Sequence, residues 1–303
     1  MFKKELQRYD KMTIEIDEEV NLKRFLLDEL NFSVRSLSKM KKNRTITVNG
    51  EFKKFNAILK KGDLVQVVID EEKGHFEAQD LNVGILYDDF DLIAVDKPPY
   101  MVVHPTKSHV DGTVANAVAH YIDKIGENVK IRFVNRLDMN TSGLVIVAKN
   151  AYAHHVLSED MKYDRIEKKY IAVVDGDVKD DDGIIDAPIY RPEGDTIKRV
   201  VDERGQESIT TYKVVERLNG ATVLEVGLKT GRTHQIRVHM AHIGHGIIGD
   251  ELYGVVDEEL INRQALHAYK LSLLQPRTKE KLNFKSEIPE DMKQLVEKLR
   301  TTK

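Results

Sequence analysis

The chain has no cysteine among its 303 residues. Disulfide bonds, thiolate nucleophiles, iron–sulfur clusters and cysteine-ligated zinc are therefore excluded. Long apolar runs are also missing: the longest, such as 143–148, are far too short to span a bilayer. The first six residues form no apolar signal segment. These absences predict a soluble, cytoplasmic protein that does not contact a membrane.

Charge is nearly balanced overall but uneven along the chain. Forty-seven lysine and arginine residues stand against 50 aspartate and glutamate residues, for a net charge of −3. Residues 35–61 hold nine bases and a single acid, Glu51, so this stretch carries +8 and the rest carries −11. A basic unit on an acidic body is typical of a polyanion-binding module attached to a larger domain. A solvated lysine-rich face explains the charge equally well.

The expected elements divide the chain into two folded units. Two helices that begin after the cap residues Asn21 and Ser33 precede strand-like segments at 46–48 and 64–69, which flank the turn Asn49-Gly50. We therefore expect an N-terminal tail (1–12), a small basic α/β domain (13–72), a linker (73–80) and a large domain (81–303).

Strands outnumber helices in the large unit, and the two do not alternate regularly. Strands are expected at 92–95, 144–148, 169–174, 209–215 and 224–228. Helices are expected behind Thr113 and behind Pro289. This pattern favours an α+β fold, with a mixed, mostly antiparallel central sheet and flanking helices, over a doubly wound fold.

A polar loop at 135–143 precedes the most apolar strand, and loops on rigid scaffolds often hold chemistry. Asp138 in this loop could act as a nucleophile or a base, and Arg136 could contact a phosphate or a base. The alternative is a structural turn in which Thr141 and Ser142 cap backbone groups. The residues alone favour that alternative by about two to one.

A second segment, 229–244, predicts a short helix that begins after the cap residue Thr233 and stops at Gly244. Arg237 lies on an otherwise apolar part of that helix. A buried arginine needs an anion, either a carboxylate such as Asp138 or a phosphate. A surface arginine or a purely structural ion pair is the alternative.

Histidines in and beside the same helix suggest a metal site at first sight: His234, His239, His242 and His245. Their spacing lacks the glutamate of the metallopeptidase helix. His239 and His242 could meet one turn apart, but no carboxylate stands nearby as a third ligand. We therefore give zinc about one chance in ten and expect no metal.

Taken in order, these motifs resemble the pseudouridine synthases of the RluA/RluD type. The resemblance spans about 86–271 and is highly specific as a set. It rests on Ala94-Val95-Asp96-Lys97-Pro98 with 102–105, Asp111-Gly112-Thr113, Arg136-Leu137-Asp138 with Thr141-Ser142-Gly143, Lys168-Lys169-Tyr170, 230–237 with His239, Gly249-Asp250 with Tyr253-Gly254, and Leu266-His267-Ala268. Residues 21–69 resemble a small RNA-binding domain first described in a ribosomal small-subunit protein.

The resemblance implies the pseudouridine synthase fold and an isomerase that converts uridine to pseudouridine in structured RNA. The RNA implied is ribosomal large-subunit RNA or transfer RNA, and the target nucleotide must be flipped out of its helix. Neither a cofactor, a nucleotide nor a metal is implied, and a monomer is expected. The residues implied are Asp138, Tyr170 and Arg237 as catalytic, Arg136, Thr141, Arg232, His234, Gln235 and Leu266 as substrate-binding, and Arg35, Lys39, Lys41, Lys42 and Arg44 as RNA-binding in the small domain.

The same resemblance implies a role for each catalytic residue. Asp138 attacks the sugar or acts through a glycal path, and Arg237 holds its charge. Tyr170 stacks on the base and takes part in removing the proton from ring carbon 5. Leu266 packs beside the pocket, and Arg136 contacts the RNA where the target nucleotide leaves the stack.

Two residues depart from the family pattern. Asn135 stands where the family usually has histidine; we expect this change to be tolerated, with a different substrate preference. Tyr100 stands where the family usually has glycine. A turn that needs a positive φ resists tyrosine, so we expect that loop to have another shape.

Two other functions stay open. One is a catalytically inactive RNA-binding factor of the same fold, which Asn135 favours weakly and the intact set of Asp138, Tyr170 and Arg237 opposes. The other is a glycosidase or metal hydrolase, which needs a second acid beside Asp138. The neighbouring sequence offers only arginine, threonine and serine.

Overall fold

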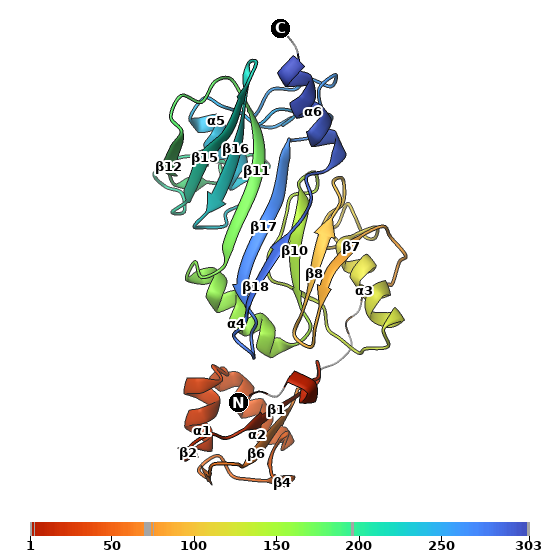
Figure 1. Ribbon diagram of the computed structural model, residues 1–303, viewed down its shortest axis with the longest axis vertical. Coiled ribbons are helices and arrows are strands. Elements are labelled where there is room, and N and C mark those ends of the chain that lie inside the picture. The colour runs from red at the N-terminus through yellow and green to blue at the C-terminus, as the bar shows by residue number, and fades with distance from the viewer. Residues whose placement is uncertain (1, 3, 70–73, 75, 195–196, 302–303) are drawn as a thin grey trace.

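The computed structural model describes residue 2, residues 4–69, residue 74, and residues 76–194 and 197–301. Within that part of the chain, a small N-terminal unit lies at one end of a large unit (Figure 1). No described helix is both long enough and apolar enough to cross a membrane.

The small unit is a four-stranded antiparallel sheet in the order β1-β6-β3-β4, with helices packed against it. Both expected caps are present: the Asn21 side chain accepts from the N–H groups of Lys23 and Arg24, and the Ser33 side chain accepts from Ser36. The elements are η1 (Lys4–Leu6), β1 (Lys11–Glu15), β2 (Val20–Asn21), α1 (Leu22–Arg24), the π-helical turn η2 (Phe25–Glu29), α2 (Val34–Asn43), β3 (Ile46–Val48), β4 (Glu51–Phe52), β5 (Ile58–Leu59) and β6 (Leu64–Val68).

The segments expected to be a tail and a linker make specific contacts. Strand β1 starts inside the expected tail, and Met12 is fully buried in the core of the small unit. Residues 70–73 and 75 lie outside the described residues. After these residues the chain contacts helix α3 (Val114–Lys124): Nδ2 of Asn116 in this helix donates to the carbonyl of Glu77 at 2.8 Å.

The large unit is built on a ten-stranded sheet in the order β12-β15-β16-β11-β17-β10-β8-β7, with β18 beside β17 and β9 beside β10. The remaining elements are β7 (Gly84–Asp88), β8 (Leu92–Lys97), β9 (Arg132–Phe133), β10 (Ser142–Ala148), α4 (Ala151–Lys162), β11 (Glu167–Asp175), β12 (Asp182–Asp186), β13 (Ile189–Tyr190), β14 (Val200–Val201), β15 (Ile209–Leu218), β16 (Ala221–Leu228), α5 (Gln235–His242), β17 (Leu266–Leu274), β18 (Lys281–Lys285) and α6 (Glu290–Thr301). The mixed, mostly antiparallel α+β fold expected from the sequence is confirmed.

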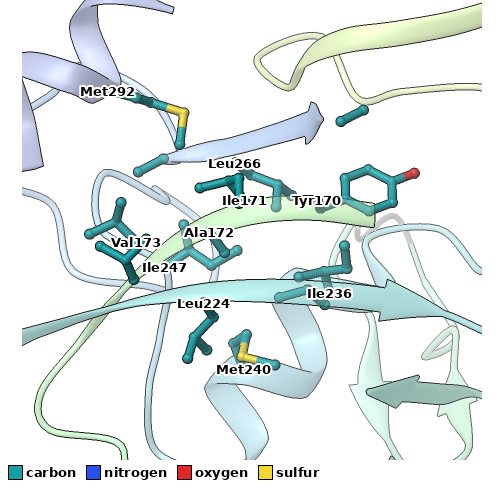
Figure 2. Packing of buried hydrophobic residues seen from close by; sticks show 14 of the residues in the cluster. Tyr170, Ile171, Ala172, Val173, Leu224, Ile236, Met240, Ile247, Leu266 and Met292 are labelled. Atoms are coloured by element: carbon teal, nitrogen blue, oxygen red, sulfur yellow. The ribbon is translucent and has the colours of Figure 1, made fainter. Parts of the chain in front are cut away.

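Helices cover both faces of this sheet. Ile93 and Val145 point to the face that α3 covers, whereas their neighbours Leu92 and Leu144 join the core on the other face. Helix α4 adds Leu157 to that second core, and α5 also packs there, as Figure 2 shows for Ile236 and Met240. Helices α4 and α5 therefore lie on the same face of the sheet, opposite α3.

The single parallel pairing among the described strands joins β10 to β17, where Ser142 lies opposite His267 and Gly143 opposite Ala268. Gly143 has a φ of +108°, and a Cβ at this position would collide with the carbonyl of Ala268. Only glycine fits such a backbone. The close approach brings the loop before β10 to the start of β17, near the middle of the sheet.

Candidate active site

A cleft of about 630 Å³ opens on the face of the sheet that carries α4 and α5. It lies between the loop before β10, the last turn of α4, the start of β11 and the start of α5. Its basic side chains are Arg136, Lys162, Lys168, Arg232 and Arg237. Asp138 is the only carboxylate that lines it among the described residues. A cleft of this charge suits a polyanion.

Asp138 sits at the first position of a tight turn, because its carbonyl accepts the N–H of Thr141 at 3.1 Å. The side chain is 29% exposed, so it can reach a ligand in the cleft. Its Oδ2 accepts a hydrogen bond from Arg237 Nη1 at 3.0 Å. A hydrogen bond from Lys97 also holds the turn in place: its Nζ donates to the carbonyl of Met139 at 2.8 Å.

Arg237 is buried and contacts two carboxylates, so the alternative of a surface arginine is wrong. Its Nε and Nη2 donate to the two oxygens of Asp250, each at 2.7 Å. Asp250 is fully buried and also accepts the N–H groups of Leu252 and Tyr253. Asp250 fixes one edge of the guanidinium through Nε and Nη2, and the remaining nitrogen, Nη1, is directed at Asp138. Sequence reasoning did not single out Asp250 as a site residue.

Helix α5 begins differently from the expectation, and the expected cap at Thr233 is wrong. His234 precedes the helix in the left-handed conformation, with a φ of +58° and no side-chain cap. The side chain of Gln235 instead ties the start of the helix to its surroundings: its Oε1 accepts the N–H of Arg232 and its Nε2 donates to the carbonyl of Ile209. Gly244 ends the helix as expected, with a φ of +84°.

His234 is oriented toward Asp138 by a chain of hydrogen bonds. The hydroxyl of Tyr253 accepts the N–H of Arg199 at 2.7 Å and lies 2.9 Å from His234 Nδ1. In the tautomer of His234 that carries its proton on Nε2, the hydroxyl of Tyr253 donates to Nδ1. Nε2 lies 3.9 Å from Asp138 Oδ2. Burial lowers the pKa of His234 below its usual value, which favours this neutral form.

Tyr170 and Leu266 form an apolar wall of the cleft. The pairing of β11 with β17 shifts register between Lys169 and Tyr170. Tyr170 lies at the end of the row of buried side chains in Figure 2. Such bulges re-aim side chains next to functional sites. Burial raises the pKa of Tyr170 well above its usual value, and the charge of Asp138 raises it further. Tyr170 is therefore a protonated phenol in this structure.

Asn135 ties the loop to strand β10 instead of pointing freely into the cleft. Its Oδ1 accepts the N–H of Ile146 at 2.8 Å, and its Nδ2 donates to the carbonyl of Leu144 at 3.1 Å. The amide thus pairs with the edge of β10 as another strand would. On the same wall, His104 lines the cleft and packs edge-on against Phe133, with ring centroids 4.4 Å apart.

The other residues expected to bind substrate fall into two groups. Arg136 and Arg232 line the cleft and are exposed. Thr141 and Gln235 also border it, but both are buried and bonded to protein; Thr141 Oγ1 accepts from Gln264 Nε2. The expectation that Thr141 and Ser142 cap backbone groups is wrong, because the Ser142 hydroxyl bonds the ring of His267.

Tyr100 overturns the expectation of a differently shaped loop. Its φ is +62°, so the backbone keeps the left-handed conformation that glycine prefers, and the side chain is 57% exposed. Lys97 holds this turn from inside, because its Nζ donates to the carbonyls of Pro98 and Met101 at 2.8 Å. Burial and the nearby charge of Arg263 together lower the pKa of Lys97 to about 7.

The histidines do not form a metal centre in the described part of the chain, where no group of three His, Asp or Glu side chains is arranged to hold an ion. Both ring nitrogens of His239 contact protein: Nδ1 lies 2.9 Å from Thr210 Oγ1, and Nε2 lies 2.9 Å from the carbonyl of Ala187. His239 is part of α5, and its side chain is fully buried. Its position is explained by packing and hydrogen bonding.

Comparison with known proteins identifies the family. A family model described as RNA pseudouridylate synthase matches residues 91–242, which include Asp138, Tyr170 and Arg237. The chain belongs to this RNA pseudouridine synthase family. The synthase is 41% identical over 276 residues to the "uncharacterized RNA pseudouridine synthase YlyB" of Bacillus subtilis (strain 168), with 90% of this chain and 91% of that protein covered.

Other relatives and structures agree with this assignment. The synthase is 37% identical over 279 residues to the ribosomal large subunit pseudouridine synthase D of Pseudomonas aeruginosa, with 86% of this chain and 85% of that protein covered. The solved structure of human RNA pseudouridylate synthase domain containing 1 matches with a TM-score of 0.58 and 25% identity over 75% of this chain and 98% of that one. The synthase is an isomerase of RNA.

Proposed function

We propose that this synthase isomerises uridines to pseudouridine in structured ribosomal large-subunit RNA, with Asp138 as the catalytic carboxylate. Bacterial relatives that match most of the chain carry the name ribosomal large subunit pseudouridine synthase D. The observation that carries the proposal is that Asp138 is the single carboxylate, among the described residues, in a cleft with five basic side chains. A flipped-out nucleotide of a polyanion fits that arrangement.

The reaction exchanges one bond of the ribose for another. The bond from the anomeric carbon to base nitrogen 1 breaks, the base turns, and a bond to ring carbon 5 forms. The proton leaves carbon 5 and one is gained at nitrogen 1, so no oxidant or reductant is required. Asp138 attacks the sugar or acts through a glycal path. Arg237 holds the carboxylate in position through its 3.0 Å hydrogen bond.

Tyr170 has a role that depends on the charge of Asp138. While Asp138 is ionised, its charge and the burial of the phenol both raise the pKa of Tyr170. A covalent bond from Asp138 to the sugar would remove that negative charge. That bond breaks again when ring carbon 5 bonds the anomeric carbon, so the charge of Asp138 returns before carbon 5 loses its proton, and Tyr170 needs local assistance to accept that proton. Before that stage, the ring and Leu266 pack against the flipped base.

The small unit supplies sequence-independent affinity for RNA in this proposal. The five bases on and just after α2, namely Arg35, Lys39, Lys41, Lys42 and Arg44, are all exposed. Phosphate contacts of this kind fix the position of an RNA without selecting a base. We also propose that the synthase is a monomer, because one chain supplies the whole cleft. We propose a cytoplasmic location, which is that of bacterial enzymes that act on ribosomal RNA.

The hydrolase alternative is weakened by the environment of Asp250. A retaining or inverting glycosidase needs a second carboxyl group that reaches the substrate. Asp250 is the second acid near Asp138, but it is fully buried and both of its oxygens bond Arg237. It does not line the cleft. The activity test distinguishes an active synthase from a catalytically inactive RNA-binding factor.

The activity test uses RNA labelled with tritium at uracil carbon 5, because isomerisation releases that tritium to water. Unmodified large-subunit ribosomal RNA and transfer RNA, both transcribed in vitro, are incubated with the synthase and with Asp138→Asn, which keeps the shape of the side chain. We expect release from ribosomal RNA by the wild type alone. Release by both proteins would refute the role of Asp138. Release from transfer RNA alone would show that transfer RNA, not ribosomal RNA, is the substrate. No release from either RNA would favour the catalytically inactive RNA-binding factor.

The role of the small unit is tested by substitution rather than by deleting residues 1–75. Deletion would remove Arg8 and Lys11, whose carbonyls accept hydrogen bonds from the buried Arg277 of the large unit. A triple variant, Lys39→Gln with Lys41→Gln and Lys42→Gln, should flatten the dependence of RNA affinity on salt by up to about one unit of slope per lysine. An unchanged slope would refute RNA binding by α2.

A further inference from the structure

The small unit is held in a fixed orientation on the large unit. Arg277, in the loop between β17 and β18, and Asp91 are both fully buried, and Arg277 Nη2 lies 2.9 Å from Asp91 Oδ1. Arg277 Nη1 donates to the carbonyls of Arg8 and Lys11, just before and at the start of β1. Undocking of the small unit would leave the buried Arg277 Nη1 and these two carbonyls without their partners, which is unfavourable in a buried site. The surface of the small unit therefore keeps a constant relation to the cleft.

Helix α4 connects the two basic surfaces. Its first turn packs into the small unit: the ring of Tyr152 lies 4.7 Å from that of Phe32, and Val156 belongs to the same core. Its last turn lines the cleft through Met161 and Lys162. Twelve residues give a helix about 18 Å long. In Figure 1 this helix lies at the junction of the two units.

One face of α4 runs the whole distance between the two basic surfaces. Ala151, His155, Ser158 and Lys162 follow one another at spacings of four, three and four residues, which places them on one face of a helix. Ala151 lines a small cavity together with Lys39 of α2. Ser158 and Lys162 line the cleft. The face carries no large apolar side chain that would favour a protein partner.

The cleft end of α4 presents two exposed bases, Lys162 and Arg165, beside three acids, Glu159, Asp160 and Asp164. Lys162 Nζ and Arg165 Cζ lie 4.9 Å and 5.2 Å from the ring centroid of Tyr163, which is 55% exposed. The nearby Asp160 and Asp164 each pair with a base, Arg165 at 3.2 Å and Lys229 at 2.8 Å. Within the described residues, Lys162 has no carboxylate within ion-pair distance. Its charge is therefore available to a ligand.

We propose that the phosphate backbone of the bound RNA crosses α4 along this face, from Lys39 of α2 to Lys162 at the cleft. This path rests on the proposed function, and it adds a third RNA-binding element between the small unit and the active site. Lys162 contacts a phosphate close to the flipped nucleotide, and Tyr163 keeps Lys162 and Arg165 in place. Because the small unit keeps a fixed orientation on the large unit, the RNA strand that crosses α4 spans a fixed distance between them.

The first test measures how RNA affinity depends on salt. Lys162→Gln should lower the steepness of log affinity against log salt by about one and weaken binding about five- to tenfold at 0.1 M salt, as expected for one lost phosphate contact. The matched control is Lys124→Gln, which removes an exposed lysine from α3 on the opposite face of the sheet. Equal slopes for the two variants would overturn the proposal.

The second test locates the strand directly. Because the chain has no cysteine, His155→Cys provides a unique attachment point for an iron chelate that cleaves nearby RNA by hydroxyl radicals. We expect cleavage of in vitro transcribed large-subunit RNA beside the modified uridine, and none from the same chelate on Lys124→Cys. Tritium release by the wild type without cleavage from position 155 would overturn the path and leave the proposed function intact. Cleavage without tritium release would support the path and refute the function.

Discussion

Arg237 and Asp250 form a two-point ion pair in which both hydrogen bonds measure 2.7 Å. Asp250 is fully buried, and Arg237 is 5% exposed. The pair leaves a single guanidinium nitrogen, Nη1, to contact Asp138 at 3.0 Å. The position of the candidate catalytic carboxylate therefore depends on a residue that does not touch the cleft.

The pair predicts that Asp250→Asn harms both stability and activity. Removal of the Asp250 charge leaves the buried Arg237 with the partly exposed Asp138 as its remaining charged partner, which costs up to about 3–5 kcal/mol. Tritium release should fall by about a hundredfold, because small displacements of reacting groups cost that much. Urea unfolding and single-turnover release measure the two effects. Glu251→Gln, at an exposed neighbouring position, is the control; equal behaviour of the two variants would contradict the positioning role.

The parts of this site that the sequence predicted are those encoded locally. Asp138, Tyr170 and Arg237 lie in continuous motifs beside strands whose apolar runs are plain. Asp250 lies in a loop without periodicity, and its function depends on a partner 13 residues away on another element. The sequence alone does not show which residue of the motif that contains Gly249, Asp250 and Tyr253 contacts Arg237.

The fold was predictable to a similar extent. Strand β10 is buried along its whole length and is evident as an apolar run. Strand β18 was not predicted, because it is short and mostly polar and is a strand only through its partner β17. Strand β17, which has nine residues and is largely apolar, was also missed. The conformations of Tyr100 and His234 were missed because tertiary contacts override the preference of these residues for negative φ.

Lys97 predicts an unusual dependence of stability on pH. Its pKa is lowered to about 7 in the folded protein, so the folded state releases this proton at a pH where the unfolded chain still binds it. The free energy of unfolding should therefore rise with pH between about 7 and 10, by up to about 1.4 kcal/mol per unit. Lys97→Met should lack this rise, whereas the exposed Lys124→Met should keep it. Urea unfolding at pH 6, 7.5 and 9 measures the difference; parallel curves for the wild type and Lys97→Met would contradict it.

Asn135 is expected to be needed for the structure of the loop. Asn135→Ala leaves the N–H of Ile146 and the carbonyl of Leu144 without their side-chain partner, which costs about 1–3 kcal/mol for each group that stays unsatisfied. Asn135→His should lose less, because an imidazole keeps one donor and one acceptor. Thermal unfolding of both variants checks the order; an alanine variant as stable as the wild type would contradict the account.

Tyr100 offers a test of backbone strain. Its φ of +62° disfavours any side chain with a Cβ, so Tyr100→Gly should be more stable than Tyr100→Ala by about 1 kcal/mol. The comparison cancels the loss of the exposed ring, which both variants share. The measurement is the urea midpoint of each. An alanine variant at least as stable as the glycine variant would show that the turn changes shape when tyrosine is absent.

The contacts of Arg277 also determine the order of events during synthesis. Its acceptors at Gln7, Arg8 and Lys11 precede it by 270, 269 and 266 residues. A ribosome adding about 5–20 residues per second makes the first of these roughly 15 to 50 s before Arg277. The small unit can fold early, but it cannot make these docking contacts until Arg277 has been made. Until then Asp91 lacks its guanidinium partner, so the nascent large unit must wait for the β17–β18 hairpin to close the junction.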